Sequence, residues 1–352
     1  MIFSPSPSSI VRAEAFRWIL LSHDFDVDYY YDFSSKREKL IKKTSKIKIF
    51  IFFNLLLRLL NKIISKYKRN SIIREIKRYD AIIVIKYPGY AFMQMIKQNA
   101  TGKILYDIDD AVWLPSFFGK EVFCKLVEIA DYISCDNSYL MNFTRKYNPN
   151  VFVLNGPSQL ELFEKRSPSP PNNDIINIGW IGSQHTLFYL YSIYNVLEKI
   201  GQKYDNVVFT IIGTGTDKSK IPEFEKIKTR VIETYDQQSM VEYVSRFDIG
   251  IYPLFENELS LGRGSLKATI YMSAKVPAIC AAVGGENEEI IEHGKNGFLA
   301  HNENDWFSLL ELLINNEKLR REVGQNGYEF VRENYSLEAC YTQLYSNFLS
   351  KI

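Results

Sequence analysis

The chain has 352 residues, of which 46% are hydrophobic, and a formal net charge of +2. A chain of this length is too long for a single small hydrophobic core and suits two domains of ~150 residues each. The four cysteines, at positions 124, 135, 280 and 340, show no paired spacing, which argues against a disulfide framework and a zinc site. The sequence has neither the ~20 consecutive apolar residues of a membrane-spanning helix nor the pattern of a secretory signal, so we expect a cytoplasmic protein.

Positive charge is concentrated in residues 36–78, which contain fifteen Lys or Arg and two Glu, whereas the rest of the chain carries −11. The apolar run from Ile47 to Leu60 lies inside this segment and is too short to cross a bilayer. A basic segment of this kind is typical of a helix on an anionic membrane surface, so we expect a peripheral protein on the inner face of the cell membrane. A basic helix packed on its own domain is the alternative. The aromatic residues are not interleaved for base stacking, so we expect no nucleic-acid partner.

Apolar runs and helical patterns alternate along the chain. Runs typical of buried strands occupy 80–85, 103–106, 132–135, 151–154, 175–181, 207–212, 248–252 and 278–281. Helical spacing of apolar residues is clearest at 187–200, 306–315 and 337–349. Short buried strands joined by helices predict an α/β fold with parallel sheets covered on both faces.

A Pro-rich polar stretch at 166–174 predicts an interdomain linker. We therefore expect an N-terminal domain at 1–165, a C-terminal domain at 175–334 and a last helix, 335–352, that crosses back to the N-terminal domain. Each domain is predicted to be a Rossmann-like doubly wound sheet, with its ligand crevice facing an interdomain cleft.

The strongest functional pattern is the Gly/Ser-rich turn Gly262-Arg263-Gly264-Ser265, which opens a predicted helix. The N–H groups of a helix start attract anions, and glycine lets the backbone approach a phosphate closely. Arg263 and Lys267 are placed to neutralise a diphosphate, and Ser265 can cap the helix or donate to a phosphate oxygen. The turn alone also allows a surface loop with incidental basic residues.

This stretch resembles the donor-site signature of family 4 of the retaining GT-B glycosyltransferases, a pattern of the form Gly-Lys-x-x-x-Lys-x-x-Glu-Tyr-Met-Ala-x-Gly-x-Pro-Val-Val. The residues that fall on the pattern are Gly262, Arg263, Lys267, Tyr271, Met272 and Pro277. Further similar stretches are 106–113, 130–140, 178–186, 248–254 and 283–299. The resemblance covers about 103–335 and is strongest in the C-terminal half.

The resemblance implies a GT-B fold and retaining transfer from a nucleotide diphosphate sugar, without cofactor or metal, to a glycan or lipid-linked acceptor in cell-surface polysaccharide synthesis. The donor-binding residues implied are Gly182, Ser183, His185, Gly213, Arg263, Gly264, Ser265, Lys267, Tyr271 and Glu289. The catalytic residues implied are Asp109, Asp110 and Lys267.

The acidic cluster of Asp107, Asp109 and Asp110 follows a predicted strand. Three readings remain open: the carboxylates line the acceptor side of the cleft, cap the following segment, or hold a divalent ion. The resemblance favours the first. Arg12, near the N-terminal Ser/Pro loop, either reaches the cleft or is a surface charge of its helix.

The sequence departs from the family pattern at the paired glutamates that commonly hold the donor ribose, where Gly262 and Ile270 stand. Losing one charged acceptor to a hydroxyl removes roughly 1.5–3 kcal/mol of binding. Glu286, Glu288 and Glu289 are candidates to replace it. Two alternatives to a transferase therefore stay open: a catalytically silent GT-B subunit that binds a partner glycosyltransferase, and a nucleotide-sugar epimerase, which needs more acid and base residues than we find.

Overall fold

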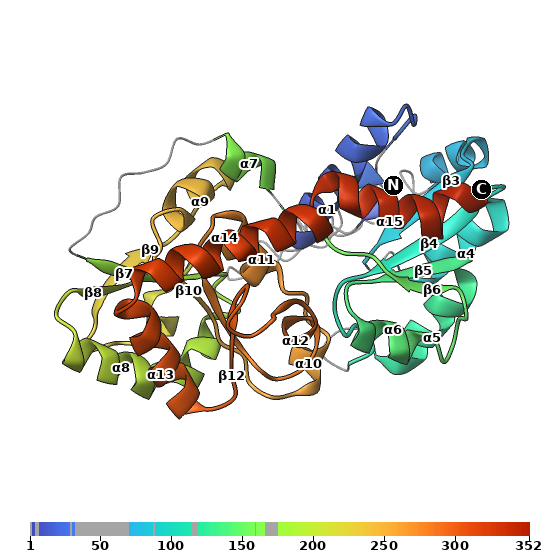
Figure 1. Ribbon diagram of the computed structural model, residues 1–352. Coiled ribbons are helices and arrows are strands. Elements are labelled where there is room, and N and C mark those ends of the chain that lie inside the picture. Colours follow the sequence, from blue (N-terminus) through green and yellow to red (C-terminus); the bar gives the residue numbers. More distant parts are fainter. Residues whose placement is uncertain are drawn as a thin grey trace, which may run out of the picture. The chain divides into compact units, whose positions relative to one another are not determined.

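The computed structural model describes residues 2–3, 7–28, 30–31, 70–86, 89–114, 119–158, 160–165 and 175–352. The chain forms two compact units (Figure 1). The first comprises Met1–Asn155 and Cys340–Ile352, and the second comprises Gly156–Ala339. The predicted linker at 166–174 and residues 36–69 of the basic segment lie outside the described residues. The domain limits drawn from the sequence stay predictions.

The first unit is built on a parallel sheet with the strand order β2-β1-β3-β4-β5-β6. Its strands are β1 (Ile2–Phe3), β2 (Tyr30–Tyr31), β3 (Ala81–Ile85), β4 (Lys103–Ile108), β5 (Tyr132–Cys135) and β6 (Val151–Val153). The helices before the second unit whose two ends are both described are α1 (Pro7–Ser22), the 3-10 turn η1 (Ile76–Arg78), α4 (Tyr90–Asn99), α5 (Lys120–Ile129) and α6 (Ser138–Thr144). The strand order reverses between β1 and β3, and ligands of doubly wound sheets bind beyond the carboxyl ends of the strands at such a point.

Apolar strands and aromatic rings form the core of the first unit. The β3 run Ile82-Ile83-Val84-Ile85 is buried throughout, as expected for a parallel strand covered on both faces. Trp113 stacks on Phe143 with ring centres 3.8 Å apart. The end of the chain, α15 (Leu337–Asn347) and the 3-10 turn η4 (Leu349–Lys351), adds Phe348, which is fully buried against the Tyr132 ring. The C-terminal residues thus complete the core of the first unit.

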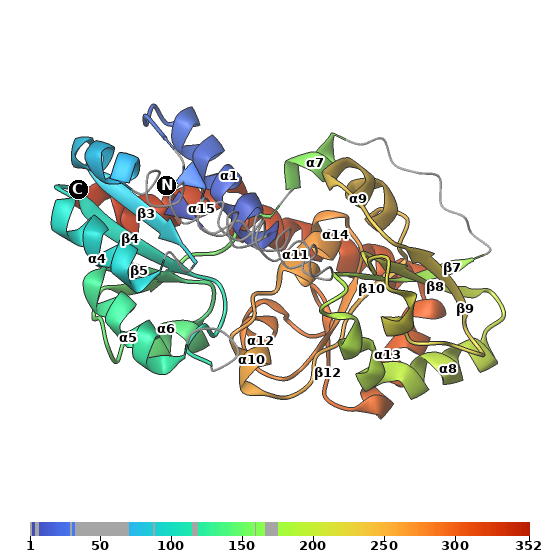
Figure 2. The ribbon, with the colours of Figure 1, turned by 180° about the vertical axis from the view of Figure 1, so that it is seen from behind.

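The second unit is built on a parallel sheet with the order β12-β11-β10-β7-β8-β9 (Figure 2). Its strands are β7 (Ile176–Ile181), β8 (Val207–Ile212), β9 (Lys228–Ile232), β10 (Ile249–Tyr252), β11 (Ala278–Ala281) and β12 (Phe298–Ala300). Its described helices are α7 (Leu160–Glu164), η2 (Leu187–Ile193), α8 (Tyr194–Lys203), η3 (Lys218–Lys220), α9 (Gln237–Val244), α10 (Glu258–Leu261), α11 (Leu266–Ser273), α12 (Glu286–Ile290), α13 (Glu303–Ile314) and α14 (Glu317–Asn334). The strand order reverses between β7 and β10, which marks the expected ligand edge.

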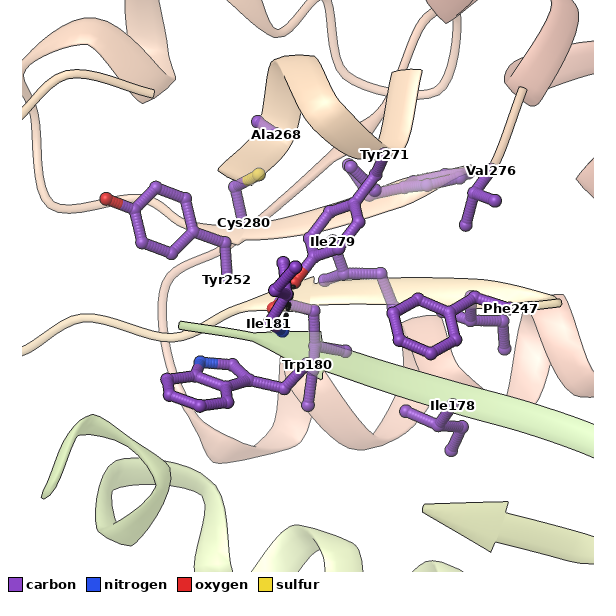
Figure 3. Close-up of a cluster of buried hydrophobic side chains, with 14 of the residues drawn as sticks. Ile178, Trp180, Ile181, Phe247, Tyr252, Ala268, Tyr271, Val276, Ile279 and Cys280 are labelled. Atoms are coloured by element: carbon purple, nitrogen blue, oxygen red, sulfur yellow. Dashed lines mark hydrogen bonds between the residues drawn. The ribbon is translucent and has the colours of Figure 1, made fainter. Parts of the chain in front are cut away.

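Tyr271 fixes α11 onto the sheet at this reversal point (Figure 3). Its hydroxyl accepts a hydrogen bond from the Ile181 N–H at 3.1 Å and donates one to the carbonyl oxygen of Ile251 at 3.1 Å. A Cβ atom on Gly250 would lie 2.5 Å from the Tyr271 ring, so the glycine makes room for that ring. One side chain of α11 therefore bridges β7 and β10, and it sets the position of the helix start above them.

The predicted α/β class with two doubly wound sheets is confirmed. The eight predicted strands are present, with bounds shifted by at most two residues. The eight predicted runs do not include β1, β2, β9 or β12. The predicted helix at 187–200 begins as the 3-10 stretch η2 before α8. None of the described helices combines the length and the hydropathy needed to cross a membrane.

Candidate functional site

Two predicted donor-site glycines meet at the carboxyl ends of β7 and β8. The Gly182 N–H donates a hydrogen bond to the carbonyl oxygen of Ile212 at 3.0 Å. Gly213 has a φ of +86°, and a Cβ atom there would overlap the carbonyl oxygen of Gly182. Only glycine combines this conformation with so close an approach. The two glycines thus let the loops after β7 and β8 approach each other closely beside the reversal point.

Lys267 lies in the first turn of α11 and is half-buried. Its Nζ atom is 4.5 Å from the centre of the Tyr252 ring and 5.7 Å from that of the Trp180 ring, so both strands at the reversal point contribute to its surroundings. No carboxylate among the described residues pairs with it. Burial, with repulsion from Arg263 second, lowers the pKa of Lys267 to about 7. A cation in such surroundings is stabilised by an anionic ligand.

Two buried hydrogen-bond donors lie near these cations. The Trp180 Nε1 and the Tyr189 hydroxyl have no hydrogen-bond partner within the part of the chain that the structure describes. The Arg263 guanidinium lies 5.6 Å from the Tyr189 ring centre. Buried donors are normally satisfied, so this corner of the second unit has an excess of hydrogen-bond donors beside the Lys267 ammonium group. That excess fits a ligand rich in acceptor oxygens.

Ser265 does not serve as the predicted cap or as a free phosphate donor. Its hydroxyl donates to the Asn287 side-chain oxygen at 2.7 Å, and its backbone N–H donates to the Glu286 carboxylate. The other Glu286 oxygen accepts a hydrogen bond from the Tyr335 hydroxyl at 2.7 Å. A carboxylate of the chain itself therefore lies at the N-terminus of α11, where negative charge is favourable.

The other predicted donor residues differ in how far a ligand can reach them. Tyr271 is fully buried, and its hydroxyl is hydrogen-bonded to two strands. It therefore positions α11 on the sheet and does not contact a ligand directly. Ser183, His185 and Glu289 are exposed. The Gly264 carbonyl oxygen accepts a hydrogen bond from Tyr252 at 3.2 Å, which ties the glycine turn to the end of β10.

Ile270, which stands where the family commonly has glutamate, is 7% exposed and belongs to the core of the second unit. Glu286, a candidate replacement, is buried with both oxygens already accepting hydrogen bonds from Ser265 and Tyr335. Glu286 is therefore engaged in the packing of α11, and a ribose hydroxyl could use only the acceptor positions that these two bonds leave on a buried carboxylate.

In the first unit, Arg12 is buried and is not a surface charge of its helix. It is 6% exposed, and its guanidinium donates to both oxygens of Asp107 at 2.6 and 2.9 Å. It also pairs with Asp136 at 2.6 Å and donates to the carbonyl oxygen of Leu154. Burial opposes the charged form, but the carboxylates, Asp107 foremost, raise the pKa of Arg12 overall. Arg12 thus joins α1 to the carboxyl ends of β4 and β5.

The remaining two aspartates of the cluster share a different cation. Lys86, at the carboxyl end of β3, has its Nζ atom 3.0 Å from Asp109 Oδ2 and 3.1 Å from Asp110 Oδ2. Within the described ranges, no three His, Cys, Asp or Glu side chains are grouped so as to hold a metal ion. Lys86 and Asp136 were not predicted from the sequence, because they follow β3 and β5, which are distant in sequence from the acidic cluster.

Comparison with known proteins identifies the class of this fold. The family model described as glycosyl transferases group 1 matches residues 174–316. An uncharacterized glycosyltransferase of Methanocaldococcus jannaschii is 37% identical over 135 residues, which cover 38% of this chain and 37% of that protein. Residues 174–316 are thus similar to group 1 glycosyl transferases.

Solved structures agree with this assignment at the level of the fold. Anabaena HepE, solved with UDP and glucose, matches with a TM-score of 0.67 at 12% identity, over 100% of this chain and 99% of HepE. TarM matches with a TM-score of 0.63 at 18% identity, over 80% of this chain and 57% of TarM. The two-unit α/β architecture is the GT-B fold.

Proposed function

We propose that the chain is a retaining, metal-independent hexosyltransferase. It moves a sugar from a nucleotide diphosphate sugar to a glycan or lipid-linked acceptor in cell-surface polysaccharide synthesis. The observation that carries the proposal is Lys267, a half-buried cation without a carboxylate partner among the described residues, at the helix start beside Arg263. The diphosphate that leaves the donor develops negative charge, and fixed cations stabilise such charge. HepE, of the same fold, was solved with UDP-glucose, which supports this donor class.

In this proposal the second unit binds the donor. Arg263 and Lys267 neutralise the diphosphate, and Gly182, Gly213 and Gly264 allow its close approach to the backbone. The exposed side chains of Ser183, His185 and Glu289 are assigned to the nucleotide and sugar. Because two cations supply the charge, no divalent ion is needed for the leaving group.

The first unit is assigned to the acceptor. Asp109 and Asp110 follow β4, which pairs with β3, one of the two strands at the reversal point where ligands of doubly wound sheets bind. Carboxylates accept hydrogen bonds from sugar hydroxyls. We assign these two aspartates to the acceptor sugar.

A thermal-shift panel of nucleotides and nucleotide sugars tests the donor assignment. A ligand at 100 times its dissociation constant stabilises the folded state by ~2.7 kcal/mol. We expect one nucleotide diphosphate and its sugar to shift the melting temperature, and mass spectrometry of an acceptor mixture to detect the added hexose. A panel without any shift and without any added hexose would refute the proposal.

A catalytically silent subunit is the second candidate, and the burial of Ile270 in place of an acidic residue favours it. Such a subunit binds a partner enzyme and releases no nucleotide diphosphate from any donor. The two functions are therefore separated by assaying nucleotide release with the purified chain alone.

We also propose that residues 36–78 dock the protein on the inner face of the cell membrane. Most of this segment lies outside the described residues. At its described end, Ile72 and Ile76 are buried in the core of the first unit, whereas Arg74 and Lys77 are exposed. The charge of the segment, fifteen basic residues against two acidic ones, supports contact with anionic lipid.

A further inference from the structure

Two ion-pair groups lie at the carboxyl edge of the first sheet, and their buried aspartates Asp107 and Asp109 differ in how many hydrogen bonds their oxygens accept. Asp107 is fully buried, and both of its oxygens accept hydrogen bonds from Arg12. Its Oδ1 accepts a further bond from the Ser134 hydroxyl at 2.6 Å. Asp107 therefore has hydrogen-bond donors on both of its oxygens, as expected of a buried structural carboxylate.

The group around Lys86 is incomplete. Asp109 is 9% exposed, and its Oδ2 faces the Lys86 ammonium at 3.0 Å. Its Oδ1 is buried and has no hydrogen-bond partner among the described residues. A buried carboxylate oxygen without a donor is unfavourable, so Asp109 has one acceptor position that suits a ligand carrying a hydrogen-bond donor.

The backbone at Lys86 adopts a strained conformation. Lys86 has a φ of +60°, in the left-handed region that non-glycine residues rarely adopt. Its N–H donates to the carbonyl oxygen of Asp107, and its ammonium group reaches Asp109 and Asp110. Burial lowers the pKa of Lys86, but the two carboxylates raise it by more, so the side chain is charged. Backbone strain of this kind concentrates at functional sites.

We propose that Lys86 is a positioning residue for acceptor binding. It holds the Oδ2 atoms of Asp109 and Asp110, which leaves Asp109 Oδ1 to accept a hydrogen bond from a hydroxyl of the acceptor sugar. Lys86 itself does not contact the sugar. This inference rests on the proposed transferase function and adds to it the atom that binds the acceptor and the residue that orients that atom.

The test compares Lys86→Met, Lys86→Arg and Asp109→Asn with the wild-type chain. Octyl glycosides of glucose, galactose and N-acetylglucosamine serve as acceptor probes, with the nucleotide sugar that the wild type uses. Lys86→Met should raise the acceptor KM by about tenfold or more and leave the donor KM unchanged, because a charge-assisted contact is lost only on the acceptor side. Lys86→Arg should restore most of the acceptor affinity, and Asp109→Asn should behave like Lys86→Met.

Lys97→Met is the matched control. Lys97 pairs with Asp131 at 2.7 Å in the same unit, away from the carboxyl ends of the strands, so its loss should not change either KM. If Lys86→Met fails to fold, the acceptor KM values of Lys86→Arg and Asp109→Asn are compared with that of the wild type instead. A wild-type acceptor KM in Asp109→Asn, or an equal rise in both KM values in Lys86→Met, overturns the inference. Absence of transfer by the wild type refutes the proposed function itself, and the inference with it.

Discussion

The ammonium group of Lys267 lies over the ring of Tyr252, 4.5 Å from its centre, at the point where the strand order of the second sheet reverses. The two residues come from different elements, since Tyr252 ends β10 and Lys267 lies in the first turn of α11. An aromatic face offers a cation only part of the stabilisation that water or a carboxylate gives. The arrangement leaves a positive charge whose best partner is an anionic ligand.

Removal of either cation should lower transfer. Lys267→Ala and Arg263→Ala are each expected to reduce kcat/KM by tenfold or more, since a charge-assisted contact contributes on the order of 1.5–3 kcal/mol. Initial rates of nucleotide diphosphate release measure the effect. Full activity in both variants would show that the phosphate assignment is wrong.

Donor affinity should fall as the pH rises above about 7. The pKa of Lys267 in the free protein is about 7, and an unfolded lysine has a pKa near ~10.4. Because the folded value is the lower one, this group destabilises the free protein below pH 7, and the stability rises with pH between these two values. A bound diphosphate favours the charged lysine, so binding takes up a proton and weakens with rising pH.

Calorimetric titrations of a nucleotide sugar at pH 6.5, 7.5 and 8.5 check this dependence, with expected losses of up to about tenfold per pH unit above pH 7. The Lys267→Met variant removes the titrating group and should bind weakly at all three pH values. A wild-type affinity that stays constant across the series would contradict the assignment of Lys267.

Transfer should persist in EDTA, since the described residues offer Arg263 and Lys267 for the diphosphate and no grouped metal ligands. The expected result is the same rate with and without chelator. Complete loss of activity in EDTA, restored by Mg²⁺ or Mn²⁺, would instead assign a metal to the reaction.

Tyr271→Phe should destabilise the second unit. The substitution removes the hydroxyl that bonds the Ile181 N–H and the Ile251 carbonyl oxygen, and it leaves two buried backbone groups without this partner. The expected cost is about 1–3 kcal/mol, which lowers the melting temperature by several degrees. Tyr191→Phe, at a ring that is 55% exposed, is the control and should leave the melting temperature unchanged. Equal melting temperatures for the two variants would show that the bridge contributes little.

The basic segment should bind anionic vesicles at low ionic strength and dissociate from them at high ionic strength. Co-sedimentation with phosphatidylcholine vesicles, with and without phosphatidylglycerol, measures the partition. Binding to the anionic vesicles should weaken as ionic strength rises, because the Debye length is ~10 Å at 0.1 M. Equal partition into both vesicle types, or none into either, would leave the segment as a packed basic helix.

The sequence predicted the buried strands well, because a parallel strand covered on both faces is a short continuous apolar run. It failed at β9, where Lys228, Thr229, Arg230 and Val231 are all exposed. An edge strand of this composition has no apolar run to recognise.

At the candidate sites, the sequence pattern found residues near one another in the chain but not the partners that folding brings to them. The sequence pattern predicted Asp109 and Asp110 as site residues, but it did not predict their partner Lys86, which lies more than twenty residues earlier. Tyr271 followed the family pattern, yet only the structure shows that its hydroxyl is used between β7 and β10. Likewise, Glu286 meets Ser265 only after α12 packs against the start of α11.

The most direct test of the account is a calorimetric titration of the preferred nucleotide sugar into the wild type, Lys267→Met and Lys275→Met. Lys275 is the matched control, because it also has its Nζ atom over an aromatic ring, 4.6 Å from the centre of the Tyr328 ring. It follows the C-terminal end of α11, whereas Lys267 lies in the first turn of that helix. The account predicts that the wild type and Lys275→Met bind equally and that Lys267→Met binds at least tenfold more weakly. Equal binding by all three proteins, or binding by none, would contradict the assignment of the donor diphosphate to Lys267.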